Sequence, residues 1–596
     1  MNCRLSKTKI ESYQGDVLPL RLLGEEELTA AEIEWFVAGD CVTARSFRGD
    51  APYSFNDGVM LTLVEVGEAT VSAAYGGETY TCTVTVRPME KASSEDDLCY
   101  YRGDFHCHTS QEHKAPAFAE DPSGISNYIQ QMKAEKRLDF GVISDHAEVT
   151  NPRDFFRGFT ETEAAQPMDF IMFPGSESEI SPIEPDRYGL NRKNGGEMVC
   201  VNVDNFVCTH GWAGFFEAYS TAPFGVCVFA HPQVVGYDRN GVWNFCFHRI
   251  NTPAMKNLVR GVEMGDGSDR ASNCLNEWVY SLALDCGFRV SATCASDCHG
   301  PVWGFEQASG KTVVMAREKS KEAFLDALRS NRFYACESGT VKLRYSVNGQ
   351  TAPADLAAAE AYQFHVEWSL MEQEPSARPV RLQVISDGGK TVYETKDFGN
   401  ILEFSVPSAT ARYFFLRLTD GAGRKTWSCP VWTGRAFGDW TPPALPPLDK
   451  AGFTATDLRT GQDASILVND DPTAYWEGRD TTAALLIDMG REQQVRALGH
   501  YPPRWDRKVL KAKGIRENEA VASFACRYRI STSVDGLSFT EQAEGILRVF
   551  GAEEILSLPP HSARYLKLEV LSTTGAESAY PALAEARVQI GELTVF

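Results

Sequence analysis

The chain lacks any apolar run approaching the ~20 residues that cross a bilayer, so we expect no membrane insertion. Its beginning, MNCRLSKTKIESYQ, has no apolar core of the ~7–15 residues that a secretory signal needs, which favours a cytoplasmic protein and leaves secretion as the alternative. Basic residues are in deficit, because 58 Lys and Arg face 80 Asp and Glu, for a net charge of −22. Since a surface of that sign repels phosphate backbones, we expect no nucleic acid partner.

Cysteine is too dilute for a disulfide scaffold, since 16 cysteines are spread over 596 residues and many stand in apolar contexts such as FGVCVF. We interpret them as reduced, small core residues. The chain also has no repeat at a fixed period and no low-complexity tract. With 43% hydrophobic and 23% charged residues it has the composition of globular protein, and at ~150 residues per domain its length predicts about four domains.

The patterning divides the chain into four regions. Runs with period-2 alternation, such as GVMLTLVEVG and ETYTCTVTVRP, predict a first Ig-like β-sandwich of about seven strands. In the second region, strand-like runs such as DFGVIS and FRVSAT alternate with helical patterns, which predicts an α/β, TIM-like barrel. A third region of β-type patterning predicts a middle β-sandwich, and the proline-stiffened TPPALPPLDK precedes a last β-rich region. The predicted domains are residues 1–88, 99–337, 338–437 and 451–596.

Histidine is scarce, with 11 in the chain, but eight of them lie between His106 and His299. Several of these, together with two acids, come at or just after the C-terminal end of a predicted strand, where α/β barrels collect their catalytic groups. Imidazoles and carboxylates that converge on one mouth are ligands for zinc, manganese or iron. The motifs are His106 and His108 in DFHCHT, His146 in SDHAE, Glu177 in PGSESE, His231 in FAHP, and Asp297 and His299 in SDCH.

These motifs also have a structural interpretation. A single histidine after a strand is more often a hydrogen-bonded structural residue than a ligand, and an HxH pair alone is undecided. Five such motifs in one region, each at a strand end, favour a metal centre. Cys107 lies between two of the ligands, and because strand side chains alternate we expect it to point away from them into the core.

The ordered series DFHCHT, ISDHAE, PGSE, FAHP and SDCH resembles the polymerase and histidinol phosphatase (PHP) superfamily of metal-dependent hydrolases. The resemblance covers residues 99–337 and implies a distorted (β/α)7 barrel with up to three metals in its mouth. The stretch RFYACESGTVKLRYSVNG and the sandwich ending in RKTWSCPVW resemble the branch that includes carbamate-hydrolysing members. The ligands implied by the motifs are His106, His108, His146, Glu177, His231, Asp297 and His299.

The sequence departs from the family pattern in two places. A further family histidine, a few residues after HxHT, corresponds to His113, with Lys114 as the competing residue. The family histidine between the PGxE and AHP motifs is replaced by Glu197 or Asn202, with His210 further on. One to three divalent metal ions per chain are therefore expected.

The ligand set implies hydrolytic chemistry. Metals bridged by Glu177 and Asp297 would lower the pKa of a bound water towards ~7 and generate hydroxide at neutral pH. His299 or His231, where not committed to metal, would protonate the leaving group. We therefore predict His231, Asp297 and His299 as the catalytic residues.

Further polar residues flank these motifs. Asp104 and Asp145 stand beside ligand motifs, and they either accept the spare N–H of a ligand imidazole or act as plain turn or cap acids. Four basic residues in the loops between motifs could hold a phosphate, although solvated loop charge is the commoner role for each. They are Arg192, Lys193, Arg239 and Arg270.

In the last region VNDDPTAYWEG, ALLIDMG, VRALGHYPPR, YRISTSVDGLSF, ARYLKLEV and GELTVF resemble the discoidin (coagulation factor five/eight type C) family, which includes family 32 carbohydrate-binding modules. The resemblance covers nearly the whole region, implies a β-sandwich, and implies a structural calcium held by oxygen ligands. The implied calcium ligands are Asn469, Asp471, Thr473 and Glu592. A sugar platform would consist of His500, Tyr501, Arg504 and Trp505, for which packing in the core is an equal alternative.

The leading functional hypothesis is a metal-dependent phosphoesterase that acts on a small phosphorylated molecule, with a saccharide as one candidate. The runner-up keeps the metal centre but cleaves an ester, carbamate or amide bond. A third hypothesis, from another class, is a glycan-binding protein whose barrel is catalytically inactive.

Overall fold

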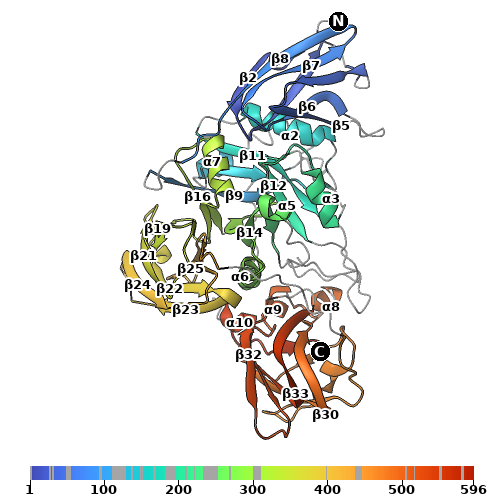
Figure 1. Cartoon of the computed structure of the whole chain (residues 1–596), viewed down its shortest axis with the longest axis vertical. Helices are drawn as coiled ribbons and strands as arrows, with labels where there is room; N and C mark the ends of the chain where they lie inside the picture. The colour runs from blue at the N-terminus through green and yellow to red at the C-terminus, as the bar shows by residue number, and fades with distance from the viewer. Residues whose placement is uncertain are drawn as a thin grey trace.

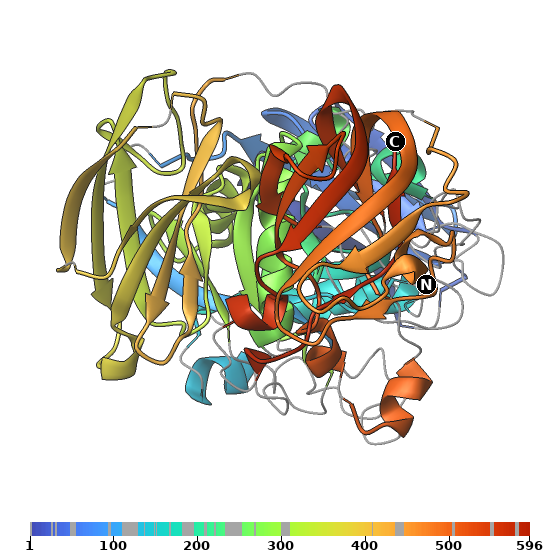
Figure 2. The same ribbon diagram turned by 90° about the horizontal axis from the view of Figure 1, so that it is seen from below.

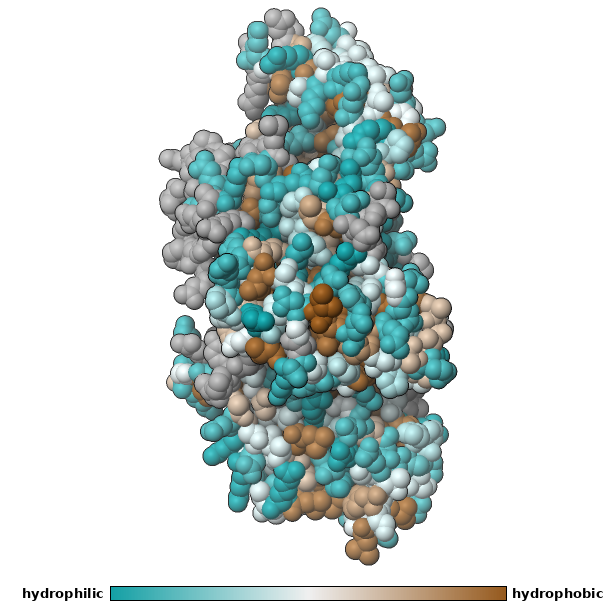
Figure 3. All heavy atoms as spheres, turned by 90° about the vertical axis from the view of Figure 1, so that its left-hand side faces the viewer, coloured by the Kyte–Doolittle hydropathy of each residue, from teal (hydrophilic) through white to brown (hydrophobic). Residues whose placement is uncertain are grey.

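The computed structural model consists mainly of β-sheets, with the N-terminal sandwich at one end of its long axis and the C-terminal region at the other (Figure 1). On the face in Figure 3, apolar side chains form small, separate groups among polar ones. Among the described residues no helix combines the length and apolarity that crossing a bilayer requires. The structure describes all residues except 1–2, 26–27, 30–31, 48–54, 93–96, 110–128, 136–137, 148–149, 151, 166–168, 181–195, 208–210, 220–221, 233–252, 267–269, 300–309, 398, 408, 436–445, 504–506, 516, 549–552 and 579–582.

The first region is a sandwich of two four-stranded sheets, so it has eight strands where the sequence predicted about seven. Alternation in β7 puts Ala69, Val71 and Ala73 on the inner face, as the period-2 pattern predicted. One sheet has the order β1 (Cys3–Leu5), β3 (Val17–Gly24), β6 (Phe55–Leu63), β5 (Val42–Phe47), and the other β2 (Lys9–Tyr13), β8 (Glu78–Arg87), β7 (Gly67–Tyr75), β4 (Glu34–Ala38).

Seven strands of the second region, β9 to β15, lie side by side in sequence order; we call them the curled sheet. They are β9 (Cys99–Cys107), β10 (Phe140–Ile143), β11 (Ile171–Glu179), β12 (Glu197–Val201), β13 (Val226–Ala230), β14 (Val259–Asp266) and β15 (Ser291–Ala295). The sheet curls so far that its last strand meets its first. Two backbone hydrogen bonds join the residues that end or follow these strands, from His108 N–H to Cys298 O and from Asp297 N–H to His106 O, each over 3.0 Å.

Strand direction within the curled sheet has one exception. β9, β10 and β11 are parallel, and so are β13, β14 and β15, whereas β12 runs antiparallel to both of its neighbours. β10 and β13 are buried along their whole length, as expected for strands covered on both faces. The associated helices are η2 (Gln131–Glu135), α2 (Pro152–Ala165), α3 (Gly211–Ala218), α5 (Pro253–Leu258), α6 (Arg270–Asp285) and α7 (Lys321–Arg329).

The sheet does not end at the predicted boundary between residues 337 and 338. From β9 it continues through β16 (Lys311–Ala316) and β17 (Phe333–Cys336) into the middle region, where a second sheet packs against it. The continuing strands are β26 (Lys425–Trp427), β25 (Tyr413–Asp420), β22 (Pro379–Ser386) and β23 (Lys390–Thr395), with β20 (Ala354–Asp355) and β27 (Val431–Trp432) beside them. The second sheet has the order β19 (Gln350–Thr351), β18 (Val341–Val347), β21 (Ala361–Leu370), β24 (Ile401–Pro407), and short 3-10 turns lie at η3 (Pro375–Ala377) and η4 (Asp387–Gly389).

The C-terminal region is a β-structure built on two long strands, β30 (Ala483–His500) and β33 (Glu554–Val570). Its main sheet has the order β28 (Thr454–Asp457), β30, β33, β31 (Arg527–Ser533), β32 (Thr540–Ile546), with β35 (Leu593–Val595) on β30; β29 (Trp476–Glu477) pairs with β34 (Gln589–Ile590). Its helical turns are η5 (Ser465–Val468), α8 (Arg507–Ala512), α9 (Glu517–Val521) and α10 (Thr574–Glu577).

Helix α6 joins three regions. It packs on β14, while its Leu275 and Trp278 lie in one apolar cluster with Val521 and Phe524 of the C-terminal region. Its last residue, Asp285, forms ion pairs with Arg412 of the middle region, at 3.2 Å, and with Arg548 of the C-terminal region. Seen from below in Figure 2, these two regions (yellow and orange-red) lie next to each other.

Candidate metal centre

The mouth of the curled sheet gathers a set of buried imidazoles and carboxylates. His106 and His108, two residues apart on β9 and directly after it, are both fully buried at this mouth. Cys107 lies between them and takes the other side, where its Sγ donates to Val142 O over 2.9 Å and packs in an apolar cluster. The expected alternation is therefore observed, and Cys107 is a core residue.

Three groups of side chains in the mouth each offer ligand atoms within 4.8 Å of one another. All seven predicted ligands belong to them, and Glu197 is added. His108 and Glu177 each belong to two groups, so the three groups form one continuous centre. We call them the outer group (His108, His146 and His299), the central group (His106, His108, Glu177 and Asp297) and the inner group (Glu177, Glu197 and His231).

The side chain of Glu177 lies where the three groups meet. Its Oε2 atom is 3.2 Å from His106 Nε2, 3.3 Å from His108 Nε2 and 3.2 Å from His146 Nδ1. This buried oxygen nevertheless accepts no hydrogen bond of acceptable geometry from the described residues. Buried polar atoms are normally paired, so a carboxylate oxygen that three imidazoles approach without such a bond fits a set of ligands around shared cations.

The buried carboxylates of the centre favour positive charge on the groups around them. Burial disfavours the charged form of His106, but the carboxylates of Glu177, Glu263 and Asp297 outweigh it and hold the pKa of His106 well above its usual range. In the same way burial opposes the charged form of His231, and Glu177 nevertheless raises its pKa to about 10. Burial alone would raise the pKa of Glu177, yet its imidazole neighbours hold that pKa well below the usual range. Divalent cations would supply the same positive charge in place of these protons.

Exposure differs across the centre. The side chains of His146, Asp297 and His299 retain 21%, 24% and 31% of their accessible surface. By contrast, Glu177, Glu197 and His231 retain 0%, 4% and 7%. Two histidines of the outer group, His146 and His299, are therefore open to the mouth, whereas its third member, His108, and the inner group are enclosed.

Two ligands have strained backbones. His231 and Asp297 have φ angles of 22° and 47°, in the left-handed region that non-glycine residues rarely occupy. His231 directly follows β13 and Asp297 stands two residues after β15. The backbone N–H of each is fixed by a hydrogen bond, from His231 to Glu263 Oε2 over 2.7 Å and from Asp297 to His106 O over 3.0 Å. Such strain costs ~1–3 kcal/mol and persists where the surroundings hold functional groups in place.

The reversal of β12 explains how Glu197 joins the centre. Because β12 runs opposite to its neighbours, its first residue lies opposite Glu179 near the end of β11 and Ala230 at the end of β13. The alternative, Asn202, follows the other end of β12 and donates from Nδ2 to Gly15 O over 2.8 Å. Of the two residues that the sequence left open, the structure therefore selects Glu197, which lies 3.3 Å from His231.

The acid that faces a ligand imidazole is Glu263 of β14, which the sequence analysis missed. Its Oε2 lies 3.3 Å from His106 Nδ1. The signal available was a lone acid inside the apolar run RGVEM. Asp104 instead accepts from the backbone N–H of Ser296 over 2.9 Å, and Asp145 from the backbone N–H of Thr109 over 2.6 Å. These two acids hold the backbone beside the ligand motifs, which is closer to the turn-acid alternative.

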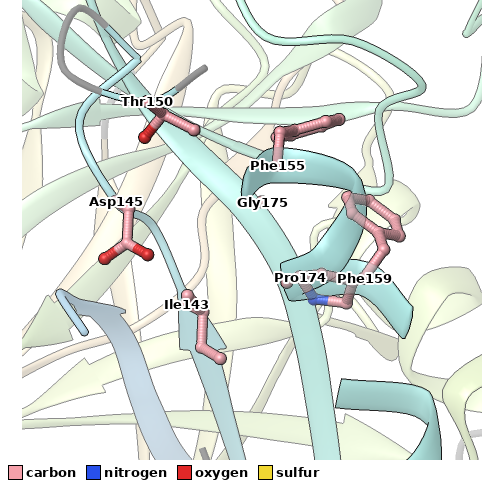
Figure 4. Close-up of a pocket in the computed structure, with 8 residues that line it drawn as sticks. Ile143, Asp145, Thr150, Phe155, Phe159, Pro174 and Gly175 are labelled. Atoms are coloured by element: carbon pink, nitrogen blue, oxygen red, sulfur yellow. The ribbon is translucent and has the colours of Figure 1, made fainter. Parts of the chain in front are cut away.

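Asp145 also borders a small hollow beside the mouth. Figure 4 shows its carboxylate across the hollow from the rings of Phe155 and Phe159 of α2, with Pro174 of β11 also lining it.

Some predicted residues lie outside the described residues, and for Arg270 only the backbone, at the start of α6, is described. The residues outside are His113, Lys114, Arg192, Lys193, His210, Arg239, Arg504 and Trp505.

The predicted calcium site holds a lysine instead. Lys450 has its ammonium group against Glu592, and it lies 2.8 Å from Asp470; Lys450 and Glu592 are both buried. A fixed cation thus lies at the carboxylate of Glu592, to which the resemblance assigned calcium. The other three predicted ligands bond within their own loop, from Asp471 N to Asn469 Oδ1 and from Thr473 N to Asp471 Oδ1, both over 2.9 Å.

The predicted sugar platform is also corrected in its described part. His500 and Tyr501 expose only 2% and 1% of their surface. They occupy the end of β30, which β33 and β35 flank within the sheet, and the position after it. A sugar ring needs an exposed aromatic face, so both residues belong to the core, the alternative that the sequence left open.

Comparisons with known proteins reach only part of the chain. No family model matches the sequence, and no curated protein matches it. Similar solved structures are carbohydrate-binding modules and related fragments, each matching about a quarter of this chain. CpGH89CBM32-5 from Clostridium perfringens, in complex with GalNAc-β-1,3-galactose, is 16% identical over 25% of this chain and 99% of that chain, with a TM-score of 0.20. The family 32 module of C. perfringens NanJ, in complex with galactose, is 17% identical over 24% of this chain and 90% of that chain, with a TM-score of 0.18. A putative chitobiase fragment from Bacteroides thetaiotaomicron is 19% identical over 26% of this chain and 96% of that chain, with a TM-score of 0.21.

Proposed function

We propose that the chain is a metal-dependent hydrolase with a PHP-type, distorted (β/α)7 barrel, and that it cleaves a phosphoester. The order of β9 to β15 and the meeting of the first and last strands support this fold. The observation that carries the proposal is the buried Glu177 Oε2, which lies within 3.3 Å of three imidazole nitrogens but accepts no hydrogen bond of acceptable geometry from the described residues. Such an arrangement suits cations shared between adjacent ligand groups.

The outer, central and inner groups would hold up to three divalent cations of zinc, manganese or iron. When bound, such ions activate water as a nucleophile at neutral pH and polarise the bond under attack. Glu263 holds the imidazole of His106 in place through Nδ1, so that Nε2 faces the other ligands.

A phosphoester fits the centre better than the alternatives because of charge. A phosphoryl group in transfer spreads negative charge over three oxygens, and positioning together with electrostatic stabilisation supplies most of the catalysis. Cations at the three contiguous positions, which share His108 and Glu177, would concentrate positive charge beside these oxygens. An acyl carbon develops charge on one oxygen only and would use fewer of these positions.

When the outer group holds no cation, His299 is better placed than His231 to deliver a proton to a leaving group. Its Nδ1 lies 2.8 Å from the carbonyl oxygen of Asp297, which fixes the ring, and its side chain is 31% exposed. His231 is enclosed and lies 3.0 Å from Glu177 and 3.3 Å from Glu197, so its role is to bind a cation. Asp297, 24% exposed, is the carboxylate nearest to an incoming substrate.

The test combines metal content with substrate class. The full chain is purified without chelator or nickel, its metals are measured by elemental mass spectrometry, and p-nitrophenyl phosphate, acetate and carbamate esters are compared. We expect one to three equivalents of transition metal and turnover of the phosphate ester. Preferred turnover of the acetate or carbamate would establish the ester or carbamate alternative. Metal without any turnover, together with binding on a glycan array, would favour the glycan-binding protein.

A matched pair of variants completes the test. The double variant His106→Ala/His108→Ala removes shared ligands, and we expect both the metal and the turnover to fall to background. His365→Ala/His561→Ala removes two histidines outside the centre, from β21 and β33, and should change neither. Retention of the metal in the first double variant would overturn the proposal.

A further inference from the structure

The inner and outer groups differ in the chemistry of their ligands. The outer group offers three imidazoles, whereas the inner group offers two carboxylates and one imidazole. Imidazole suits zinc and other borderline cations, while carboxylate oxygens suit harder cations such as manganese and magnesium. The two groups would therefore differ in the metal that each prefers.

The difference comes from Glu197. Because β12 is reversed, this carboxylate enters the mouth from the beginning of its strand and lies 3.3 Å from Nε2 of His231. The carboxylate of Glu177 faces the same nitrogen from 3.0 Å. Glu197 is 4% exposed, so its charge is enclosed, and a cation between the two carboxylates would offset the cost of burying them.

Accessibility differs in the same direction. His299 and His146 of the outer group keep 31% and 21% of their side-chain surface, so an ion held there would meet chelators and competing metals directly. The inner group keeps 7% or less, so an ion held there would exchange through an enclosed site. Ligand chemistry and access together separate the two positions.

We infer that the inner group selects a hard divalent cation of the manganese class while the outer group takes zinc, so that the loaded centre contains two different metals. This inference rests on the proposed function, since it assigns metals to the same centre. Zinc binds most protein sites more tightly than manganese. The prediction is therefore that zinc displaces manganese from the two positions unequally.

The experiment uses the full chain and does not depend on turnover. Protein stripped with a chelator is loaded with excess Mn2+, titrated with Zn2+ and freed of unbound metal. Bound manganese is then counted by elemental mass spectrometry and by electron paramagnetic resonance. We expect one equivalent of manganese per chain to resist zinc at concentrations that displace the rest. Glu197→His makes the inner group richer in imidazole. In this variant, the zinc concentration that displaces the resistant manganese should fall at least about tenfold. Loss of a hydrogen-bonding partner of a metal ligand already changes metal affinity by that factor, and here a ligand itself is changed.

Two further variants make the result specific. Glu179→Gln neutralises the carboxylate directly opposite Glu197 on β11, outside the three groups, and should behave as the wild type. Glu197→Gln keeps the shape but removes the charge, and it should lose the resistant equivalent if the histidine variant does not fold. Displacement of all manganese together in the wild type, or an unchanged resistant equivalent in both Glu197 variants, would overturn the inference while leaving the metal centre intact. Absence of both metals from the wild type would instead overturn the proposed function.

Discussion

Nδ1 of His106 lies 3.3 Å from Oε2 of Glu263, and the same oxygen accepts the backbone N–H of His231 over 2.7 Å. One buried carboxylate thus orients a ligand imidazole from β9 and holds the strained backbone of a second ligand after β13. Glu263 therefore couples the central group to the inner group without belonging to either.

The first prediction concerns the charge of Glu263. Glu263→Gln retains an oxygen for the backbone of His231 but removes the negative charge beside His106, so we expect metal affinity to fall ~10–100-fold. Competition with a chromophoric chelator measures the change. Thermal unfolding of the metal-free variant should stay near that of the wild type, whereas Glu263→Ala, which also loses the oxygen for His231, should unfold at a lower temperature. Unchanged affinity in both variants would show that the contact with His106 has no effect on the ligand.

Sequence motifs located the centre because its ligands stand at strand ends. His106 lies near the end of β9, His231 directly follows β13, and His146 and Asp297 stand three and two residues beyond β10 and β15. A pattern of short apolar runs followed by His or Asp is visible without coordinates. Strand direction is not visible in this way. Glu197 begins its strand, so it enters the mouth only because β12 is reversed.

Other features depended on contacts that are distant in sequence. Glu592 meets Lys450, 142 positions earlier, and no local pattern announces that pair. Likewise, the aromatic and polar residues at the end of β30 suit either a sugar platform or a core, and only the burial of His500 and Tyr501 in the folded chain decides between them. The β-rich character of the first, third and last regions was predictable from periodicity, whereas the continuous sheet from β9 to β23 was not.

The second prediction is a pH dependence that originates at His500. Burial lowers the pKa of His500 to about 4, and neither ring nitrogen has a hydrogen-bond partner among the described residues. Between the folded-state pKa of about 4 and the unfolded-state pKa of ~6.5, the unfolded chain binds more protons than the folded chain. The contribution of neutral His500 to the free energy of unfolding is therefore fully present above pH ~6.5 and is lost as the pH falls towards about 4. The slope should reach at most about 1.4 kcal/mol per pH unit.

Calorimetry of the full chain from pH 4 to 7 tests this dependence. His500→Leu removes the titrating group and should flatten the decline of the unfolding temperature at acid pH. His561→Gln changes a histidine of β33 whose ring contacts Thr532 Oγ1 at 2.8 Å, and it should keep the wild-type decline. An identical acid decline in the wild type and His500→Leu would assign the effect to other groups.

The third prediction concerns Glu277 of α6, which anchors the middle region. Its buried carboxylate accepts from Trp427 Nε1 over 2.9 Å and pairs with Lys425, at 3.2 Å, and with Arg417. Removing one partner from a buried ion pair costs about 3–5 kcal/mol, so Glu277→Gln should lower the unfolding temperature markedly. The exposed Glu367 pairs with His365 on the surface, and its change to Gln should cost at most about 1 kcal/mol. Equal small shifts in both variants would mean that the interface does not depend on this charge.

The fourth prediction concerns Lys450 and Glu592 of the C-terminal region. Burial raises the pKa of Glu592 even though the ammonium group of Lys450 acts to lower it, so the carboxylate depends on that cation. In Lys450→Met the carboxylate loses its buried partner, which should cost about 3–5 kcal/mol. Because the carboxylate of Asp470 also lies against the ammonium group of Lys450, it would offer a second oxygen ligand, and millimolar calcium should restore part of the lost stability.

Thermal unfolding with calcium and with a calcium chelator separates these effects. The wild type should unfold at the same temperature in both, because a tethered ammonium group already occupies the site. Lys450→Met should unfold at a lower temperature in the chelator and recover on addition of calcium. Asp470→Asn, which changes a carboxylate with 63% of its side-chain surface exposed, should shift the wild-type temperature only slightly. If calcium stabilised the wild type as much as the variant, the lysine would not be the cation of this site.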